Sequence, residues 1–355
     1  MNTIDWLSPE ENGEWDEFVG RHPLGLVYHL SAWTDVLETA FKHIHGGVVV
    51  LRDGNGQIKA GLPVYNIKSW LLKNRTVSLP FASVGDPLVS NIEEFSLLWQ
   101  PIEDMAVRNR SKRIEIRTRL VAAESIPEFL TAGTKYKHHH LRLDESADAL
   151  LRSFHQSCVT RRIKKAKREA VVVEERHDDD DLRTFYSIME ETRRRQMLPP
   201  MPYKFFHTML HRMGPDHASL YLAIQNGQAI GGMLALKTKN IWTGEYSGQV
   251  ENAHSGSDQL LYWHVIQLAK NSGAKSFSFG RTTLDNTGLL DYKRRWATIE
   301  EDATDYIYPL SRAKLRDDDP NHSVNPVFYS TARLIQHAPH WVQRMVGDFC
   351  YRHLG

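Results

Sequence analysis

The sequence predicts a mixed α/β protein built from two tandem copies of one domain. The first observation is a repeated turn, because Asn-Gly-Gln occurs at 55–57 and again at 226–228, each time between two apolar runs. Asn-Gly between strand-like runs is a strong β-hairpin signal, since both residues tolerate positive φ. The second is a common order of elements around both turns, and the third is the length of 355 residues. A repeated unit in a chain of this length predicts about two domains.

The first domain is expected over residues 1–145. Ser8 and the acidic residues after it are typical of a helix start, and a second helix is expected at 31–41. A third helix is expected at 91–109, interrupted at Pro101. Strands are expected at 46–53, 57–68, 75–81 and 111–120. Helices, an antiparallel meander, a helix and a strand make a mixed α/β unit.

The second domain is expected over residues 146–310, opening with one long helix from Ser146 to Ala170. Strands are expected at 170–175, 218–227, 228–239, 241–249, 276–281 and 302–309. Helices are expected at 180–196, 203–213, 256–273 and 287–297. The hairpin, third strand, helix and final strand repeat the order of the first domain. Residues 311–355 are expected to form a linker and an amphipathic helix.

Composition excludes several classes of protein. The chain has 44 basic and 43 acidic residues, so no global charge attracts it to nucleic acid. Cys158 and Cys350 are too few for a disulfide framework or a cysteine zinc site, and Cys158 lies on the apolar side of its helix. The acidic N-terminal stretch is unlike a signal peptide, and no apolar run is long enough to span a membrane. We expect a soluble, cytoplasmic protein.

A possible donor-binding loop is Ser255-Gly256-Ser257, between a strand and the helix expected at 256–273. Helix N-termini present backbone N–H groups that suit a pyrophosphate, and Gly256 permits close approach of a ligand. The alternative is that a serine only caps the helix, and Asp258 would repel an anion.

A second candidate comprises Arg281 at a strand end and Tyr292 and Lys293 on the following helix. Residues at such positions commonly line α/β ligand sites, and Lys293 could stabilise a developing oxyanion or a phosphate. The alternative is a solvated basic helix face.

A third is the basic helix 160–170, where Arg161, Arg162 and Lys165 could hold phosphates of a nucleotide, a tRNA or a lipid headgroup. The alternative is a surface helix with Ile163 and Ala166 inward. No aromatic stacking pattern accompanies it, so we expect no sequence-specific nucleic-acid binding.

Two further stretches complete the candidates. Gly85 and Asp86, in the loop 79–89, either line a pocket or are structural. The three histidines at 138–140 lack metal-ligand spacing, so no metal site is expected.

Six motifs, in order, resemble the Fem family of aminoacyl and peptidyl transferases, within the GNAT acyltransferase superfamily. They lie at 28–41, 79–89, 153–175, 185–206, 231–248 and 276–297, so the resemblance covers about residues 5 to 310. The stretches TRRRQMLPPMPYKFF and GLLDYKRRW are most similar to Fem-like proteins of exopolysaccharide and exosortase systems.

The resemblance implies two GNAT-like domains and transfer of an acyl or aminoacyl group to an amine or hydroxyl. The acceptor would belong to the cell envelope, such as a peptidoglycan precursor, or to exopolysaccharide metabolism. Lys293, preceded by Tyr292, matches the family lysine that helps to hold the acyl adduct. Trp33 matches the acceptor-side helix, but Thr34 and Asp35 follow it where precursor-binding members tend to carry a basic residue.

Chemistry of this kind needs no tightly bound cofactor, because acyl-CoA or aminoacyl-tRNA is a co-substrate. Lys293 or backbone N–H groups would stabilise the tetrahedral oxyanion, and Glu245 is the predicted general base. Two alternatives remain: a small-molecule N-acetyltransferase that uses acyl-CoA, and a non-catalytic module that binds a glycan or an assembly partner.

The C-terminal segment carries an apolar stripe of residues spaced three or four apart. Its members are Trp341, Val342, Met345, Val346, Phe349 and Cys350. This helix is expected either to pack on the first domain or to bring 327–355 into peripheral contact with the inner membrane.

Overall fold

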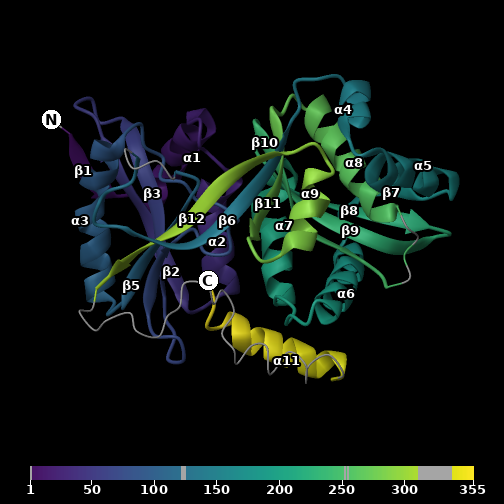
Figure 1. Ribbon diagram of the computed structural model, residues 1–355. Helices are drawn as coiled ribbons and strands as arrows, with labels where there is room; N and C mark the ends of the chain where they lie inside the picture. Colours follow the sequence, from purple (N-terminus) through teal and green to yellow (C-terminus); the bar gives the residue numbers. More distant parts are fainter. Residues whose placement is uncertain (1, 121–124, 252, 254–255, 311–337) are drawn as a thin grey trace. The chain divides into compact units, whose positions relative to one another are not determined.

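The computed structural model describes residues 2–120, 125–251, 253, 256–310 and 338–355, which form two compact units (Figure 1). The first unit comprises the described residues of 2–136, 302–310 and 349–355, and the second those of 137–301 and 338–348. Strands β6 (Thr131–Arg142) and β12 (Ile299–Pro309) each run from one unit into the other along the chain. The domain boundaries at 145 and 310 remain predictions.

The first unit is a sheet flanked by helices. Its elements are β1 (Thr3–Trp6), η1 (Pro9–Glu11), α1 (Asn12–Arg21), η2 (Val27–His29), α2 (Ser31–Ala40), β2 (Ile44–Arg52), β3 (Ile58–Ile67), β4 (Arg75–Ser78), α3 (Ile92–Arg108) and β5 (Arg113–Thr118). The strand order is β1-β2-β3-β4-β5-β12, in which β4 and β5 are parallel and the other neighbours antiparallel.

Side chains alternate along β3, so neighbouring residues of this strand lie on opposite faces of the sheet. Leu62 and Val64 belong to the core cluster that contains Phe95 of α3. Gly61 faces α1, where a Cβ atom would lie 2.5 Å from the ring of Trp15. Helix α3 continues through Pro101, so the predicted interruption is wrong. Its buried face against the sheet holds the helix despite the donor that proline lacks.

The second unit repeats this architecture. Its elements are α4 (Ala147–Ser153), η4 (Gln156–Thr160), α5 (Arg161–Arg168), β7 (Val172–Arg176), α6 (Asp179–Arg195), α7 (Tyr203–His217), β8 (Ala218–Gln225), β9 (Gln228–Lys237), β10 (Ile241–Gln249), α8 (Ser257–Asn271), β11 (Ser276–Thr283) and α9 (Thr287–Arg294). The strand order is β6-β11-β10-β9-β8-β7.

The predicted repeat is confirmed strand by strand. Asn226 and Gly227 both adopt positive φ in the turn between β8 and β9, as a two-residue hairpin requires. In each unit an antiparallel hairpin leads to a third strand and a helix, and the strand after that helix is parallel to the third strand. The mixed α/β fold with tandem domains is therefore confirmed.

The expected single helix from Ser146 to Ala170 is wrong, because the chain divides it into α4, η4 and α5. Phe154 is extended, with ψ at 152°, and its buried ring packs edge-on against Trp263 and Trp296. The next helical segment then begins afresh, with the Nδ1 atom of His155 accepting from the amide of Cys158. Burial of one aromatic side chain outweighs the helical continuity that the sequence predicted.

The C-terminal helix α11 (His340–Tyr351) begins in the second unit, where the guanidinium of Arg344 donates to the buried carboxylate of Glu190 at 2.5 and 2.8 Å. The prediction that it packs on the first domain is therefore wrong for its first turns. Residues 349–355 do contact the first unit, where Arg117 donates to the carbonyl of Gly355 at 2.8 Å. Among the described residues, no helix combines the length and the apolar character that crossing a membrane requires.

Candidate active site

Strands β10 and β11 run parallel and then part, and the candidate site lies where they separate. Their last paired residues are Thr243 and Ser278, although both strands continue beyond them. The register of β10 against β9 shifts between Gly244 and Tyr246, so Glu245 occupies a β-bulge. A bulge redirects a side chain and is common beside active sites.

Lys293 of α9 lies against β11 just past this point. Its Nζ atom donates to the carbonyl oxygens of Gly280, at 3.0 Å, and Arg281, at 3.3 Å. Gly280 has a φ of 71°, which other residues rarely adopt, and its N–H donates to Ser278 Oγ at 3.1 Å. Lys293 is only 5% exposed, so it is no part of a solvated basic face.

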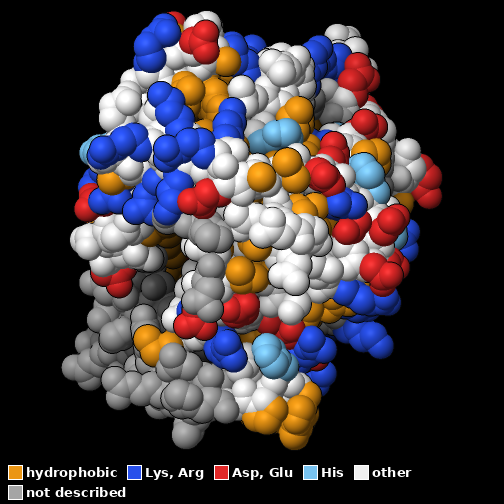
Figure 2. Space-filling model, turned by 90° about the vertical axis from the view of Figure 1, so that its right-hand side faces the viewer, with side chains coloured by type: hydrophobic (Ala, Val, Ile, Leu, Met, Phe, Trp, Pro, Cys, Tyr) orange, Lys and Arg blue, Asp and Glu red, His pale blue; other side chains and the backbone are white. Residues whose placement is uncertain are grey.

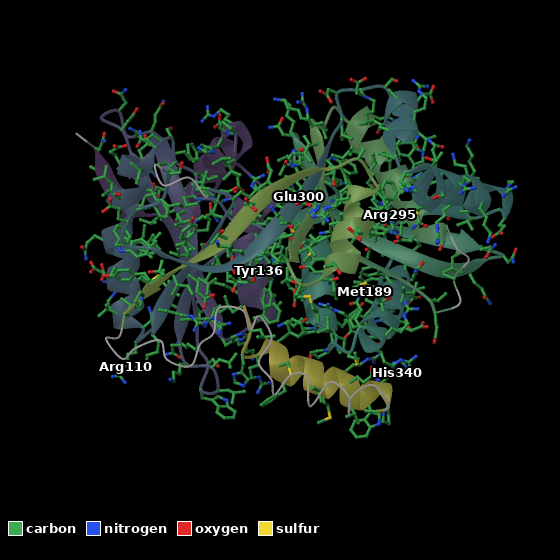
Figure 3. All side chains as sticks on the ribbon, viewed as in Figure 1. Arg110, Tyr136, Met189, Arg295, Glu300 and His340 are labelled. Carbon is green, nitrogen blue, oxygen red and sulfur yellow. The ribbon has the colours of Figure 1, made fainter. Side chains whose placement is uncertain are left out.

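The two residues after Lys293 do form such a face. Arg294 and Arg295 are exposed, and Arg295, which follows the last residue of α9, is labelled in Figure 3. The solvated alternative therefore holds for these two arginines and fails for the lysine beside them.

The ammonium of Lys293 is electrostatically unusual. Burial lowers its pKa to about 8, and the carboxylate of Glu245 acts in the opposite direction. The structure thus brings Glu245, which the sequence indicated separately, to the candidate that contains Lys293 and Arg281. An ammonium has three N–H donors, and the two carbonyls use two of them, so one further acceptor such as an oxyanion can be bound.

Tyr292 points toward a different partner. Its hydroxyl donates to Asp258 Oδ2 in the first turn of α8 at 2.6 Å. Burial raises the pKa of Asp258, and the bond from Tyr292 and the charge of Arg162 oppose that shift. The phenol therefore ties α9 to the start of α8, and its catalytic role stays a prediction.

Gly256 occupies the N-cap of α8, with a φ of 126°. A Cβ atom at Gly256 would lie 2.3 Å from the carbonyl oxygen of Arg162, so both the conformation and the packing require glycine. Ser257 is fully buried, and Ser255 lies outside the described residues. The cap is thus a glycine, and the first-turn amides of α8 begin beside the basic helix α5.

The basic helix α5 meets the start of α8 although the two are far apart in the sequence. Arg161 and Arg162 are exposed, and Lys165 is half-buried with its Nζ 3.7 Å from the carboxylate of Glu169. Figure 2 shows Lys and Arg side chains gathered on this face of the molecule, where α5 lies. Ile163 and Ala166 are buried, as expected for a surface helix, so the packing and the basic face coexist.

The predicted acceptor residues Trp33, Gly85 and Asp86 all belong to the first unit. Trp33 is fully buried, and its ring meets Tyr28 edge-on at 5.1 Å. A Cβ atom at Gly85 would lie 2.9 Å from the side chain of Leu79. The structure places all three in packed surroundings, and their part in acceptor binding stays a prediction.

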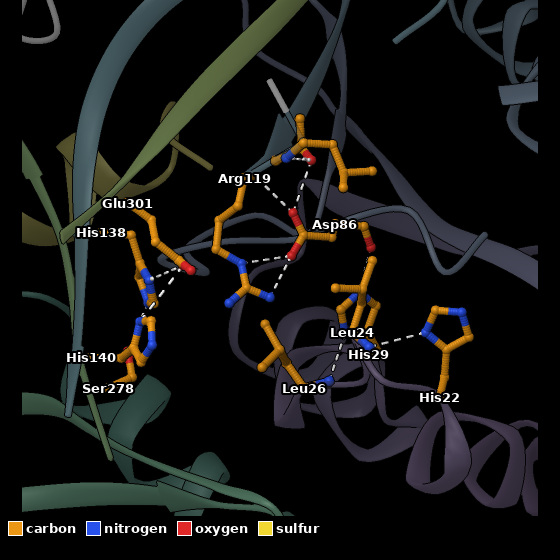
Figure 4. Close-up of polar contacts among 12 residues, drawn as sticks. His22, Leu24, Leu26, His29, Asp86, Arg119, His138, His140, Ser278 and Glu301 are labelled. Atoms are coloured by element: carbon orange, nitrogen blue, oxygen red, sulfur yellow. Dashed lines mark hydrogen bonds and ion pairs between the residues drawn. The ribbon is translucent and has the colours of Figure 1, made fainter. Parts of the chain in front are cut away.

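Asp86 forms a buried ion pair that sequence reasoning missed (Figure 4). Its carboxylate accepts from Arg119 Nε at 2.8 Å and from Thr118 Oγ1 at 2.8 Å. Burial acts to raise the pKa of Asp86, yet the charge and hydrogen bonds of Arg119 hold it below its usual value. Its carbonyl accepts from His29 Nε2 at 2.9 Å, and burial lowers the pKa of His29 to about 4. No motif links these residues, because they lie on separate loops and strands.

Residues 139–294 match the family model described as an acetyltransferase (GNAT) domain. This stretch contains Glu245, Gly256 and Lys293, the residues around the parted strands. The match supports an acyltransferase, with a GNAT-type domain over residues 139–294.

A solved structure of FemX is similar to this chain, with a TM-score of 0.70 at 14% identity, covering 87% of this chain and 97% of FemX. The L-PGS of Bacillus licheniformis has a TM-score of 0.54 at 14% identity, covering 94% of this chain and 99% of that one. A tandem GNAT protein from the clavulanic acid biosynthesis pathway has a TM-score of 0.54 at 12% identity, covering 87% and 98%. At these identities the likeness establishes the fold. No curated protein matches the sequence.

Proposed function

We propose that the second unit transfers an acyl or aminoacyl group to an amine or hydroxyl of a cell-envelope or exopolysaccharide-related acceptor. The observation that carries the proposal is the buried ammonium of Lys293, held by two backbone carbonyls where β10 and β11 part. Buried lysines that keep a donor available are suited to binding developing negative charge. The likeness in fold to FemX and L-PGS supports an envelope acceptor.

The proposed reaction is direct transfer without a covalent enzyme intermediate. The acceptor nitrogen or oxygen attacks the donor carbonyl, and Glu245 takes the proton that the nucleophile loses. Lys293 holds the tetrahedral oxyanion, and collapse breaks the bond to the leaving thiol or hydroxyl, which receives the proton from Glu245. Holding both reactants in line supplies much of the rate acceleration.

The donor is proposed to place its phosphates at the start of α8. The backbone amides of this helix begin at Gly256, and Arg161 and Arg162 bring positive charge to the same place. Acyl-CoA and aminoacyl-tRNA both carry phosphates in the same molecule as the acyl group, so this chemistry serves either donor. A small-molecule N-acetyltransferase would use the same site with acyl-CoA alone.

Donor binding tests this assignment. Thermal-shift titrations with acetyl-CoA, longer acyl-CoAs and charged tRNA should show stabilisation by one class of donor. Replacing Arg161 and Arg162 by Gln should weaken binding of that donor by at least about tenfold and reduce the salt dependence of binding. Replacing Arg108 of α3, an exposed arginine in the first unit, is the matched control and should change neither quantity. Unaltered affinity in the double variant would place the phosphates elsewhere.

We also propose that α11 brings the protein to an anionic membrane surface, where a lipid-linked acceptor would be found. Trp341, Met345 and Phe349 lie four residues apart on one side of this helix and are 64%, 62% and 47% exposed. In the first unit, Trp70 is 77% exposed and its ring centroid lies 6.4 Å from that of Phe349. Exposed apolar rows of this kind suit a lipid interface.

Basic side chains flank the exposed tryptophan. Lys68 and Lys73 are both exposed and enclose Trp70 and Leu71 in the loop between β3 and β4. Lysine near a membrane surface adds about 1 kcal/mol of attraction to anionic lipid. An apolar tip between two lysines therefore favours anionic lipid over a neutral one.

Vesicle sedimentation tests membrane contact. Wild-type protein should sediment with phosphatidylglycerol vesicles and much less with phosphatidylcholine. Replacing Trp341 and Met345 together by Ser should weaken binding by at least about tenfold, because two large apolar side chains no longer enter the interface. Leu97→Ser, at an exposed apolar residue of α3, is the control and should bind like wild type. Equal sedimentation of all three proteins would contradict the proposal.

A further inference from the structure

Two of the three adjacent histidines on β6 face a carboxylate of β12 within the second unit. His138 and His140 lie two residues apart on one strand, so their side chains share a face. The Oε2 atom of Glu301 lies 3.7 Å from His138 Nδ1 and 3.6 Å from His140 Nδ1 (Figure 4). All three ligand atoms lie within 4.8 Å of one another.

These spacings are close to those of a metal site. Ligand atoms at about 2.0–2.1 Å from a tetrahedral zinc ion are about 3.4 Å apart. The two nitrogen–oxygen distances exceed that value by a few tenths of an ångström, and the two histidine nitrogens lie within 4.8 Å of each other. Rotation of these side chains would therefore bring the three atoms around one ion. Imidazole nitrogens with one carboxylate oxygen are ligands that suit Zn²⁺ and related ions.

The surroundings orient the histidines for this role. His138 Nε2 lies 3.0 Å from Ser278 Oγ, and a hydrogen bond from Nε2–H to that oxygen leaves the lone pair of Nδ1 facing Glu301. His139, between the two, points to the opposite face of β6. There it contacts Glu300, which is labelled in Figure 3 and also accepts from Arg294. Alternation along the strand thus places His138 and His140 on one face of β6 and His139, with its partner Glu300, on the other.

We infer that His138, His140 and Glu301 bind a divalent transition-metal ion of the Zn²⁺ class, with a fourth position open to water. Ring burial supports this choice, because His138 is 3% and His140 17% exposed. A second cluster, Asp179 with His207 and His211, has histidine side chains that are 41% and 52% exposed. These imidazoles compete with bulk water, so the cluster serves as an internal control.

The inferred site does not depend on the proposed reaction, but it contacts β11, the strand against which Lys293 lies. Ser278 Oγ contacts His138 and also accepts from the N–H of Gly280. The carbonyl of Gly280 in turn accepts from Lys293. A bound ion would therefore fix the part of β11 that carries these groups.

Zinc titration of untagged, chelator-stripped protein tests the inference by calorimetry, with Co²⁺ absorption as the second readout. Wild type should bind one Zn²⁺ at the cluster, and bound Co²⁺ should give the visible spectrum of a site with imidazole ligands. His140→Ala and Glu301→Gln should each weaken zinc binding by more than about tenfold. Mutating a residue that only hydrogen-bonds to a zinc ligand already lowers metal affinity by about that factor. The double variant His207→Ala with His211→Ala should bind like wild type.

The outcomes are separable. Glu301 is 43% exposed, so Glu301→Gln is expected to fold. If His140→Ala fails to fold, the zinc affinity of Glu301→Gln alone tests the inference. Unchanged zinc affinity in Glu301→Gln, or loss only in the His207 and His211 variant, would overturn the inference. Absence of zinc binding by wild type at micromolar concentration would overturn it as well.

Discussion

Replacing Lys293 by Met should lower kcat for acyl transfer by about 10²–10³-fold, the cost of removing one oxyanion donor. The substitution removes the ammonium that Gly280 and Arg281 position, while a methionine of similar length fills the buried space. The melting temperature should stay the same or rise. Below pH 8 the folded protein must keep a charged lysine in a buried place, and methionine removes that requirement.

The control for this variant is Lys270→Met on α8. Lys270 also donates to a backbone carbonyl, that of Leu143, at 3.0 Å in the same unit. Its loss removes a comparable hydrogen bond away from the parted strands, so turnover should be unchanged. Full activity in Lys293→Met, or equal losses in both variants, would show that the site is misplaced.

Replacing Asp86 by Ala should lower the free energy of unfolding by about 3 kcal/mol, since removing one partner of a buried ion pair leaves the other unmatched. Asp86 is fully buried, and Arg119 and Thr118 both donate to its carboxylate. Denaturant unfolding measures the change. Asp104→Ala, at an exposed residue of α3 that accepts from Gln100, is the control and should change stability by less than about 0.5 kcal/mol.

The loss should depend on pH with a definite sign. The pKa of Asp86 is lower in the folded protein than in the unfolded chain. The contribution of the ion pair is therefore fully present above the unfolded pKa of about 4 and is lost as the pH falls through the lower folded value. If Asp86→Asn instead leaves stability intact and abolishes transfer, Asp86 acts in acceptor binding, as the sequence suggested.

The repeated hairpins predicted the architecture because their signal is local. The residue types at Asn226 and Gly227 predict the positive φ angles that the turn has, and the apolar runs beside them have the period of a strand. The same local reasoning failed at Phe154, where α4 ends because an aromatic ring packs against residues more than a hundred positions away. Tertiary packing overrides local propensity at such points, and the spacing of residues in the sequence does not predict these long-range contacts.

The candidate site was predicted in pieces rather than as a whole. Glu245 and Lys293 were each indicated by local chemistry, but their proximity depends on how β10 and α9 pack against β11. Arg162 meets Gly256 because α5 packs against α8. The partners of Asp86 and the carboxylate facing His138 were missed, because each contact joins elements distant in the sequence. Such contacts follow from sheet order, which the two hairpins alone do not determine.

The pH dependence of transfer in wild type and Lys293→Arg tests the central claim most directly. With a saturating donor and acceptor, the wild-type rate should fall as the pH rises through about 8, because Lys293 then loses the proton that holds the oxyanion. Arginine stays charged throughout this range, so a variant that retains measurable activity should keep its rate above pH 8. Identical alkaline limbs in the two proteins would contradict the assignment of Lys293 to the transition state.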